Sequence, residues 1–268
     1  MSLADWQSRL VELASRGTAT DDTAAAALDA SERGWFASAA LHPGAQVTRD
    51  VVHDLRWRRV VASAPLTLLA LRRCGLLDGA RTSYLAETFT PSSRASAEGR
   101  QFLADVHSRW GRVTDGGNTP DRHHLATIVA LERAVLAART STWTTNIRAS
   151  RPDDAVAPGI GGLVAARCDA AALLRRLLAN EPLPAPGSGH GAFLVAPGLA
   201  GGFREASPSE IRALTLVGEG CPVSEVAGLW PRDLIDPSTL VRLESIGALV
   251  RQPSVRAGRG GILSGSPA

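Results

Sequence analysis

In the first half of the chain, hydrophobic positions recur at intervals of three and four residues, the spacing that places side chains on one face of an α-helix. One such stripe consists of Leu3, Trp6, Leu10 and Leu13. Gly17 follows the stripe in the position of a helix C-cap, which predicts that a first helix ends there. Asp21 or Asp22 is placed to cap an alanine-rich second helix that runs toward Trp35 and Leu41.

The same spacing continues through several further segments. The sequence His42-Pro43-Gly44 is expected to break the second helix, and a third helix is predicted after Thr48. Pro65 marks a stop or a kink in the helical pattern. The remaining helices of this half are predicted at 82–89, 95–110 and 121–139. Together these segments predict a bundle of roughly six or seven helices.

The second half of the chain has a different pattern, with short apolar runs separated by glycine and proline. Predicted strands at 192–196 and 203–206 flank the turn PGLAGG, so we expect a hairpin. Ser207, Pro208 and Glu210 occupy the positions of a capping box that opens the next helix. The other predicted elements are a strand at 163–167, helices at 171–179, 211–218, 221–230 and 236–247, and a strand at 248–252. A hairpin followed by three short helices and a strand is typical of a winged helix-turn-helix.

The sequence therefore predicts an α+β fold that is mostly α. We expect an N-terminal helical bundle over residues 1–148, a linker over 149–162 and a small winged-helix module over 163–252. The Gly/Ser/Arg-rich residues 253–268 are expected to form a disordered tail.

Composition narrows the class of protein. The 268-residue chain is 44% hydrophobic and 21% charged, values that are ordinary for a globular protein. All 29 basic side chains counted as Lys and Arg are arginines, so enzymes that need a lysine Schiff base or a P-loop lysine are excluded. The net charge of +3 is dispersed among 26 acidic residues and forms no basic patch typical of nucleic-acid binding.

The cysteines and the lengths of the apolar runs indicate where in the cell the protein is expected. Cys74, Cys168 and Cys221 are far apart without CxxC spacing, which indicates neither a disulfide framework nor a zinc site. For Cys74 and Cys221, near predicted helix ends, a small buried residue is the expected role. No apolar run has the length of a membrane span or of a signal peptide. We therefore expect a cytoplasmic protein with no membrane partner.

No catalytic or metal-ligating set emerges from the sequence. His123 and His124 are adjacent, and neighbours in a helix point about 100° apart, whereas two ligands of one ion need to be three or four positions apart. We therefore expect a solvated or capping role for this pair. The chain has no G-x-S-x-G elbow and no G-x-G-x-x-G loop between a strand and a helix. The sequence thus predicts no catalytic residue and no metal site in this chain.

One carboxylate stands out. Glu132 lies in the middle of the apolar stripe of the helix predicted at 121–139, and an unpaired buried charge would cost several kcal/mol. The structural interpretation is a core ion pair. Its candidate partners are Arg56, Arg59 and Arg139. The functional interpretation is a site that faces a partner subunit.

Three runs carry a resemblance to a known family. Residues 201–250, GGFREASPSEIRALTLVGEGCPVSEVAGLWPRDLIDPSTLVRLESIGALV, resemble the winged helix that recognises ribosomally made, modified peptides, the RiPP recognition element. Upstream, YLAETFTPSSRASAEGRQFLADV and LATIVALERAVLAA are similar to the helical domain of the partner proteins of multinuclear non-haem iron-dependent oxidative enzymes. The methanobactin biosynthesis partner subunit belongs to that family. The similarity spans about residues 50 to 250 by pattern.

The resemblance implies a non-catalytic subunit that forms a heterodimer with an iron enzyme and helps it hold the leader of a precursor peptide. The iron would belong to the partner, so no cofactor is expected here, and the core peptide would contain cysteine, aspartate or asparagine. In the family the leader adds as a strand to a sheet edge, which needs an unpaired edge and an apolar groove. The matching residues are Phe203, Arg204 and Glu205 on the strand and Leu240, Val241, Leu243 and Glu244 on the helix. The insertion EPLPAPGSGHG departs from the pattern and leaves the register of the first strand open.

Two other interpretations remain open at this point. A winged-helix transcriptional regulator would bind DNA, but the helix at 236–247 offers only Arg242, with Glu244 nearby, to read bases. The following segment carries Arg251, Arg256 and Arg259, which would suit weak contact with a phosphate backbone. We therefore expect no nucleic-acid partner and keep the regulator as the alternative. A third interpretation is an enzyme whose site is assembled from dispersed residues.

Overall fold

The computed structural model describes residues 29–86, 94–110, 120–141, 155–218 and 237–252. The chain divides into two compact units: residues 1–140 with 164–193, and residues 141–163 with 194–268. The sequence pattern predicts a boundary near residue 150, and the first of these ranges ends at residue 140. However, residues 164–193, which the sequence pattern assigned to the second module, belong to the first unit. The predicted first helix, the helix at 221–230 and the tail lie outside the described residues.

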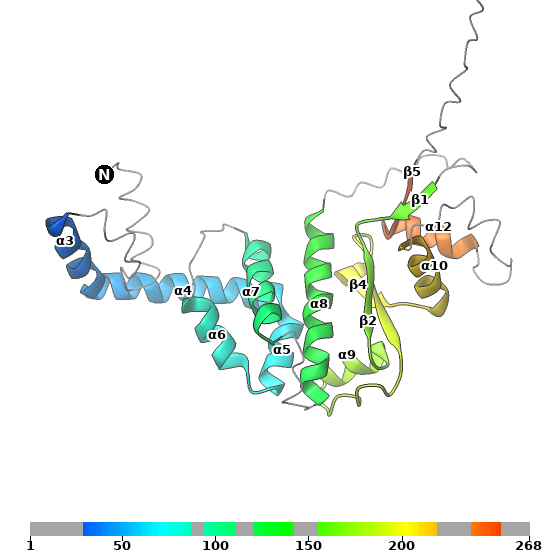
Figure 1. Ribbon diagram of the computed structural model, residues 1–268, viewed down its shortest axis with the longest axis horizontal. Coiled ribbons are helices and arrows are strands. Elements are labelled where there is room, and N and C mark those ends of the chain that lie inside the picture. Colours follow the sequence, from blue (N-terminus) through cyan, green and yellow to red (C-terminus); the bar gives the residue numbers. More distant parts are fainter. Residues whose placement is uncertain (1–28, 87–93, 111–119, 142–154, 219–236, 253–268) are drawn as a thin grey trace, which may run out of the picture. The chain divides into compact units, whose positions relative to one another are not determined.

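The first unit is a bundle of helices (Figure 1). Its described helices are α3 (Ala30–Leu41), α4 (Pro43–Ser63), α5 (Pro65–Arg73), α6 (Leu77–Ala86), α7 (Ala95–Trp110), α8 (Pro120–Thr140) and α9 (Ala170–Leu178). The bounds of α7 agree with the prediction, and those of α8 agree to within a residue or two. Pro65 separates two helices as predicted, because it stands at the first position of α5.

Three predicted helix starts were wrong. The helix expected at 82–89 begins earlier, at Leu77, as α6. The continuous helix expected from Asp21 or Asp22 to Leu41 is excluded, because Asp29 has an extended backbone and is the N-cap of α3. Asp29 and Glu32 form a capping box at this point, with Glu32 N donating to Asp29 Oδ1 at 2.7 Å and Asp29 N donating to Glu32 Oε2 at 3.1 Å. The helix expected after Thr48 begins earlier, at Pro43, since the His42 side chain accepts the N–H of Gly44 at 3.0 Å and caps it.

The core of the bundle contains a buried polar cluster. Arg56 Nε lies 3.5 Å from Glu98 Oε2, and both side chains are almost fully buried. The hydroxyl of Tyr84 donates to the same carboxylate, and the Arg56 guanidinium lies 4.7 Å from the centroid of the Tyr84 ring. Burial, followed by the hydrogen bond to Glu98, raises the pKa of Tyr84 well above its usual value. The cluster joins α4, α6 and α7.

Helices α4 and α7 approach closely beside this cluster. A Cβ on Gly99 would overlap the Cβ of Ser63, so only glycine fits. Ser63 Oγ lies 2.7 Å from the Arg59 carbonyl and 2.9 Å from the Ala95 carbonyl. This packing covers the C-terminal half of α4. Figure 1 shows α6 and α7 beside that half and α3 at the opposite end of the helix.

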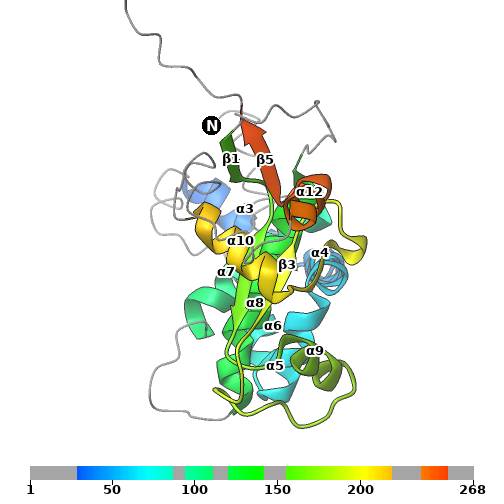
Figure 2. The same cartoon turned by 90° about the vertical axis from the view of Figure 1, so that its right-hand side faces the viewer.

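The remaining elements contain short strands and two further described helices. These elements are β1 (Ala155–Pro158), β2 (Gly162–Ala166), β3 (Gly191–Val195), β4 (Phe203–Glu205), α10 (Pro208–Gly218), α12 (Pro237–Ser245) and β5 (Leu249–Gln252). β2, β3 and β4 form a sheet in that order, so the two strands of the predicted hairpin are neighbours. The segment predicted as a linker contains β1, which pairs antiparallel with β5, as Figure 2 shows.

Close backbone approaches hold the end of α12 in the second unit. The N–H of Gly198 donates to the Ile246 carbonyl at 3.0 Å, and the N–H of Gly159 donates to the Ala248 carbonyl at 2.9 Å. A Cβ on Gly159 would overlap the carbonyl oxygen of Gly247, which itself has a φ of 78°. These contacts require glycine at both positions and fix where β5 begins.

The described chain is thus mostly helical with small antiparallel strand pairing, in agreement with the predicted α+β class. Within the described ranges, no helix has both the length and the apolar character needed to cross a membrane.

Candidate functional site

Glu210 begins the site, at the first turn of α10. The sequence Ser207-Pro208-Ser209-Glu210 folds as the capping box predicted for it. Ser207 N donates to Glu210 Oε2 at 2.9 Å, and Glu210 N donates to Ser207 Oγ at 3.3 Å. The carboxylate is thereby turned back toward the residue that precedes the helix. Its side chain has no exposed surface.

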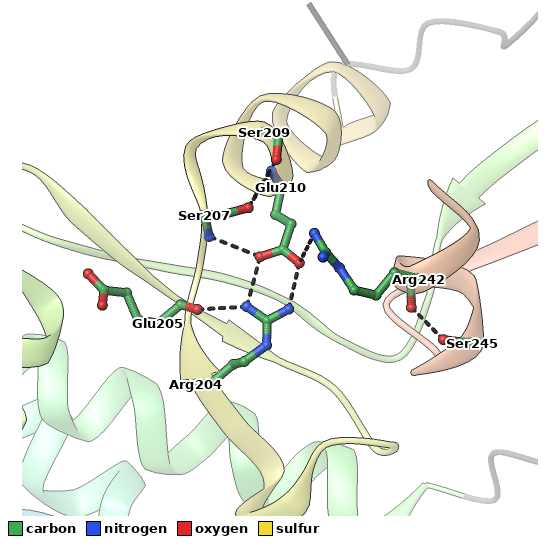
Figure 3. A network of polar contacts seen from close by, with 7 residues as sticks. All are labelled: Arg204, Glu205, Ser207, Ser209, Glu210, Arg242 and Ser245. Atoms are coloured by element: carbon green, nitrogen blue, oxygen red, sulfur yellow. Dashed lines mark hydrogen bonds and ion pairs between the residues drawn. The ribbon is translucent and has the colours of Figure 1, made fainter. Parts of the chain in front are cut away.

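Two arginines from different elements converge on this carboxylate (Figure 3). Arg204 on β4 donates from Nη1 to Oε2 at 2.8 Å and from Nη2 to Oε1 at 2.5 Å. Arg242 on α12 places Nη2 at 3.1 Å from Oε1. The arginine side chains are 39% and 51% exposed, respectively, so a buried carboxylate is covered by two partly exposed guanidinium groups.

The electrostatic balance keeps Glu210 ionised. Burial by itself raises the pKa of a carboxyl, because it disfavours the charged form. Here the hydrogen bonds from Arg204 and Ser207 and the positive charge of Arg204 outweigh burial, and they lower the pKa of Glu210 to about 2. The carboxylate can therefore act as a fixed negative link between β4 and α12 at neutral pH.

Arg204 also contacts its own strand. Its Nη1 donates to the carbonyl of Glu205 at 2.8 Å. The Arg204 guanidinium therefore contacts both Glu210 and the last residue of β4. Its planar set of N–H donors positions β4 relative to the Glu210 carboxylate. Sequence reasoning assigned Arg204 to peptide binding, and it did not foresee that Glu210 and Arg242 would join it.

The seven residues matched by resemblance are divided between the two linked elements. On β4, which lies at one edge of the β2-β3-β4 sheet, Phe203 and Arg204 are half-buried and Glu205 is exposed. On α12, Leu240 and Glu244 are half-buried. Val241 is 60% exposed, whereas Leu243 is fully buried. Leu243 therefore packs in the core, and Val241 is the most accessible apolar side chain of the set.

Glu132 is buried as predicted, but its hydrogen bonds differ from the prediction. Its two carboxylate oxygens accept the N–H groups of Leu66 at 2.7 Å and Thr67 at 2.8 Å. It thus satisfies the first turn of α5, whose N-cap residue provides no side-chain cap. Burial raises the pKa of Glu132, against the opposing effect of these hydrogen bonds and of the Arg139 charge. Arg56, one of the predicted partners, is paired with Glu98 instead.

The expectation of a solvated or capping role for the adjacent histidines was wrong for His124, which is buried. Its Nε2 lies 2.7 Å from the Pro184 carbonyl oxygen, and its Nδ1 lies 3.8 Å from Cys168 Sγ. Since a carbonyl only accepts, Nε2 carries the proton and Nδ1 accepts from the thiol. Burial raises the pKa of Cys168, followed by the effect of the Asp169 charge. This pair connects α8 to the segments around α9.

No part of the chain that the structure describes holds three or more His, Cys, Asp or Glu side chains in an arrangement that could bind a metal. When the chain is compared with known protein families and with curated proteins, it matches none of them. The candidate site is the arrangement of β4, α10 and α12 around Glu210, which combines a strand edge, a partly exposed helix and an ionic link.

Proposed function

We propose that this protein is a non-catalytic, cytoplasmic partner subunit that binds the leader of a ribosomally made precursor peptide. It would present that peptide to a multinuclear non-haem iron oxidative enzyme, with which it forms a heterodimer. The observation that carries the proposal is the link through Glu210. It joins β4 to α12, and these are the two elements that the resemblance assigns to the peptide. In this proposal the segment from β3 to β5 is a winged helix of the peptide-recognition type.

An edge strand supports such binding physically. β4 is the last strand of its sheet, and a strand at an edge can accept an added strand through main-chain hydrogen bonds. Affinity in this mode comes from the backbone, and specificity comes from side chains beside the edge. The partly exposed Val241 and the half-buried Leu240 of α12 would supply apolar contact.

The ionic link would hold the two elements in register for the peptide. Arg204 would act by positioning, because its guanidinium is engaged by Glu210 and Glu205. A buried, hydrogen-bonded charge pair is a weak source of stability but can fix a particular arrangement. Loss of Glu210 would therefore weaken peptide binding without removing any side chain that touches the peptide.

Peptide binding is tested by fluorescence anisotropy with a labelled leader from a precursor peptide encoded beside the gene. Val241→Asp is expected to weaken binding by about tenfold or more, since it places a charge in the apolar contact. Leu178→Asp is the matched control, because Leu178 is 65% exposed on α9, and it is expected to leave binding unchanged. Equal effects of the two variants, or no binding of the leader by the natural chain, would refute the proposal.

The heterodimer requires its own experiment. The full chain with an affinity tag is co-expressed with the iron enzyme encoded beside it, and the complex is isolated at two salt concentrations. Recovery of both proteins in equal amounts supports the partnership. Recovery of the tagged chain alone, with the enzyme soluble in the same lysate, contradicts it.

The alternative function, a DNA-binding regulator, has less support. Arg242, which the regulator would need for reading bases, contacts the buried Glu210. A mobility shift with the DNA upstream of the gene discriminates the two functions, because phosphate contacts predict that binding falls steeply as salt rises. A strong, salt-dependent shift would favour the regulator over the peptide-binding subunit.

A further inference from the structure

The ionic contact around Glu210 carries more positive than negative charge. The Glu210 carboxylate contributes one negative charge, whereas Arg204 and Arg242 contribute two positive charges, because an arginine side chain stays protonated in proteins. The carboxylate is buried, and both guanidinium groups that cover it are partly exposed. The surface at this point therefore presents an excess positive charge above a buried negative one.

Arg242 uses only part of its hydrogen-bonding capacity in this contact. Arg204 already binds both oxygens of Glu210, donating to Oε2 from Nη1 and to Oε1 from Nη2. Arg242 reaches the same carboxylate through Nη2, at 3.1 Å from Oε1. A guanidinium has five N–H donors in one plane, and Nε and Nη1 of Arg242 have no partner among the described residues. Arg242 can therefore bind a second carboxylate while it stays in contact with Glu210.

The other glutamates of β4 and α12 do not neutralise this charge. Figure 3 shows the Glu205 side chain directed away from Glu210 and from both guanidinium groups; only its main-chain carbonyl contacts Arg204. Glu244 is two positions from Arg242 on α12, and residues two apart in a helix do not face each other. Neither carboxylate is therefore placed to occupy the remaining donors of Arg242.

The excess charge lies at the place where the proposed function puts the peptide. Arg204 is the middle residue of β4, an edge strand of its sheet. The Arg204 and Arg242 guanidinium groups contact the same oxygen of Glu210, so they are neighbours. Val241, the exposed apolar side chain of α12, immediately precedes Arg242 in the chain. A strand added to β4 would therefore lie beside both an apolar group and a guanidinium.

The surrounding charge favours a single carboxylate over a phosphate backbone as the ligand. β4, α10 and α12 together carry three arginines and three glutamates, namely Arg204, Arg212, Arg242, Glu205, Glu210 and Glu244. Binding to a nucleic acid draws on several cations gathered on one face, and these elements carry no such excess. A guanidinium matches a carboxylate closely, since two parallel N–H groups can donate to its two oxygens.

We propose that Arg242 determines specificity by binding the carboxylate of an aspartate or glutamate in the leader peptide, an inference that rests on the proposed function. Glu210 holds Arg242 beside β4, and the N–H groups that Glu210 leaves unused donate to the peptide carboxylate. Arg204 keeps its positioning role, since Glu210 and the Glu205 carbonyl already bind it. The substrates are therefore precursor peptides with an acidic residue in the part of the leader that pairs with β4.

A double-mutant cycle tests this contact, by fluorescence anisotropy with the labelled leader of the precursor peptide encoded beside the gene. Each Asp of the leader is changed to Asn and each Glu to Gln, one at a time, and every peptide is titrated against the full natural chain and against Arg242→Gln. One acidic substitution and Arg242→Gln should each weaken binding by about fivefold or more. The two losses should not add, because both remove the same contact.

The matched control is Arg212→Gln. Arg212 is an exposed arginine of α10, so this variant removes the same charge from the same unit. It lies two positions from Glu210 in the helix and therefore does not face the same way. Leader affinity should stay within about twofold of the natural chain. The substitutions in the leader need no change in the protein, so they test the contact even where Arg242→Gln lowers stability.

The outcomes separate this contact from the proposed function. A leader that binds the natural chain equally well after every acidic substitution, or that binds without containing an acidic residue, overturns the contact and leaves peptide binding standing. Additive losses, or equal losses in Arg242→Gln and Arg212→Gln, also overturn it. Absence of leader binding by the natural chain overturns both proposals. A salt-dependent mobility shift of DNA that Arg242→Gln abolishes overturns the contact too, because the arginine would then bind phosphate.

Discussion

Arg204 donates hydrogen bonds from both of its terminal nitrogens to the two carboxylate oxygens of Glu210, at 2.8 and 2.5 Å. Arg204 lies on β4, and Glu210 lies in the first turn of α10. Arg242 of α12 contacts the same carboxylate. The contact therefore joins β4, the start of α10 and α12, which are separate in the sequence.

Replacing Glu210 by glutamine should destabilise the second unit. The glutamine side chain has one acceptor oxygen instead of two and no negative charge, so its NH₂ group would face the donors that now bind Oε2, Arg204 Nη1 and Ser207 N. We expect the free energy of unfolding to fall by about 2 kcal/mol, measured by urea denaturation followed by circular dichroism. Glu205→Gln, at the exposed neighbouring position, is the control and should change stability by less than about 0.5 kcal/mol. Equal stability of the two variants would contradict this role of Glu210.

The same contact predicts a particular pH dependence. The pKa of Glu210 is lowered to about 2 in the folded protein from an ordinary value of 4.5. Its contribution to stability is therefore fully present above about pH 4.5 and is lost as the pH falls toward 2. The difference in unfolding free energy between the natural chain and Glu210→Gln should shrink between pH 5 and pH 3. A difference that stays constant over this range would show that the carboxylate charge plays no part.

Glu132 is expected to contribute to the stability of the fold and not to binding of the leader. Glu132→Ala leaves the N–H groups of Leu66 and Thr67 without their acceptor at the start of α5. We expect a loss of about 3 kcal/mol in unfolding free energy and a lower soluble yield. Leader binding by the fraction that folds should be unchanged. Normal yield and stability together with lost association with the iron enzyme would instead assign Glu132 to a partner-facing surface.

The buried histidine gives a spectroscopic prediction. His124 should carry a proton on Nε2, because Nε2 faces the Pro184 carbonyl oxygen. Nitrogen chemical shifts of the ring distinguish this tautomer from the other one. A ring protonated on Nδ1 at neutral pH would contradict the assigned hydrogen bonds.

The accompanying thiol should be unreactive. Cys168 is fully buried and Cys74 is partly exposed, so although burial raises the pKa of both thiols, only Cys74 is accessible to a reagent. In a Cys221→Ser background, iodoacetamide at pH 8 should therefore label Cys74 well before Cys168, as followed by mass spectrometry. Faster labelling of Cys168 would contradict its burial.

Much of the helical part could be predicted from the sequence because its signals are local. Pro65 and the apolar spacing of 95–110 were sufficient to place α5 and α7. Two of the wrong starts also had local signals. Asp29 and Glu32 form a capping box inside an alanine-rich run, and Pro43 opens a helix where the pattern suggested only a break.

The parts that could not be predicted depend on contacts between distant residues. β1 is short, and its partner β5 lies at the other end of the second unit, so the segment was interpreted as a linker. Glu132 was placed in the core correctly, but its acceptor role depends on where α5 begins. The capping box of Glu210 was predicted, whereas the convergence of Arg204 and Arg242 on it required the fold.

Backbone hydrogen–deuterium exchange with and without the leader peptide tests the central claim most directly, because strand addition protects the amides of the edge strand that receives it. We predict slower exchange in a peptide that covers β4 (Phe203–Glu205) and in α12, with no change in α7 of the bundle. Unchanged exchange at β4 under saturating leader, or protection confined to the helical bundle, would contradict the proposed peptide-binding site.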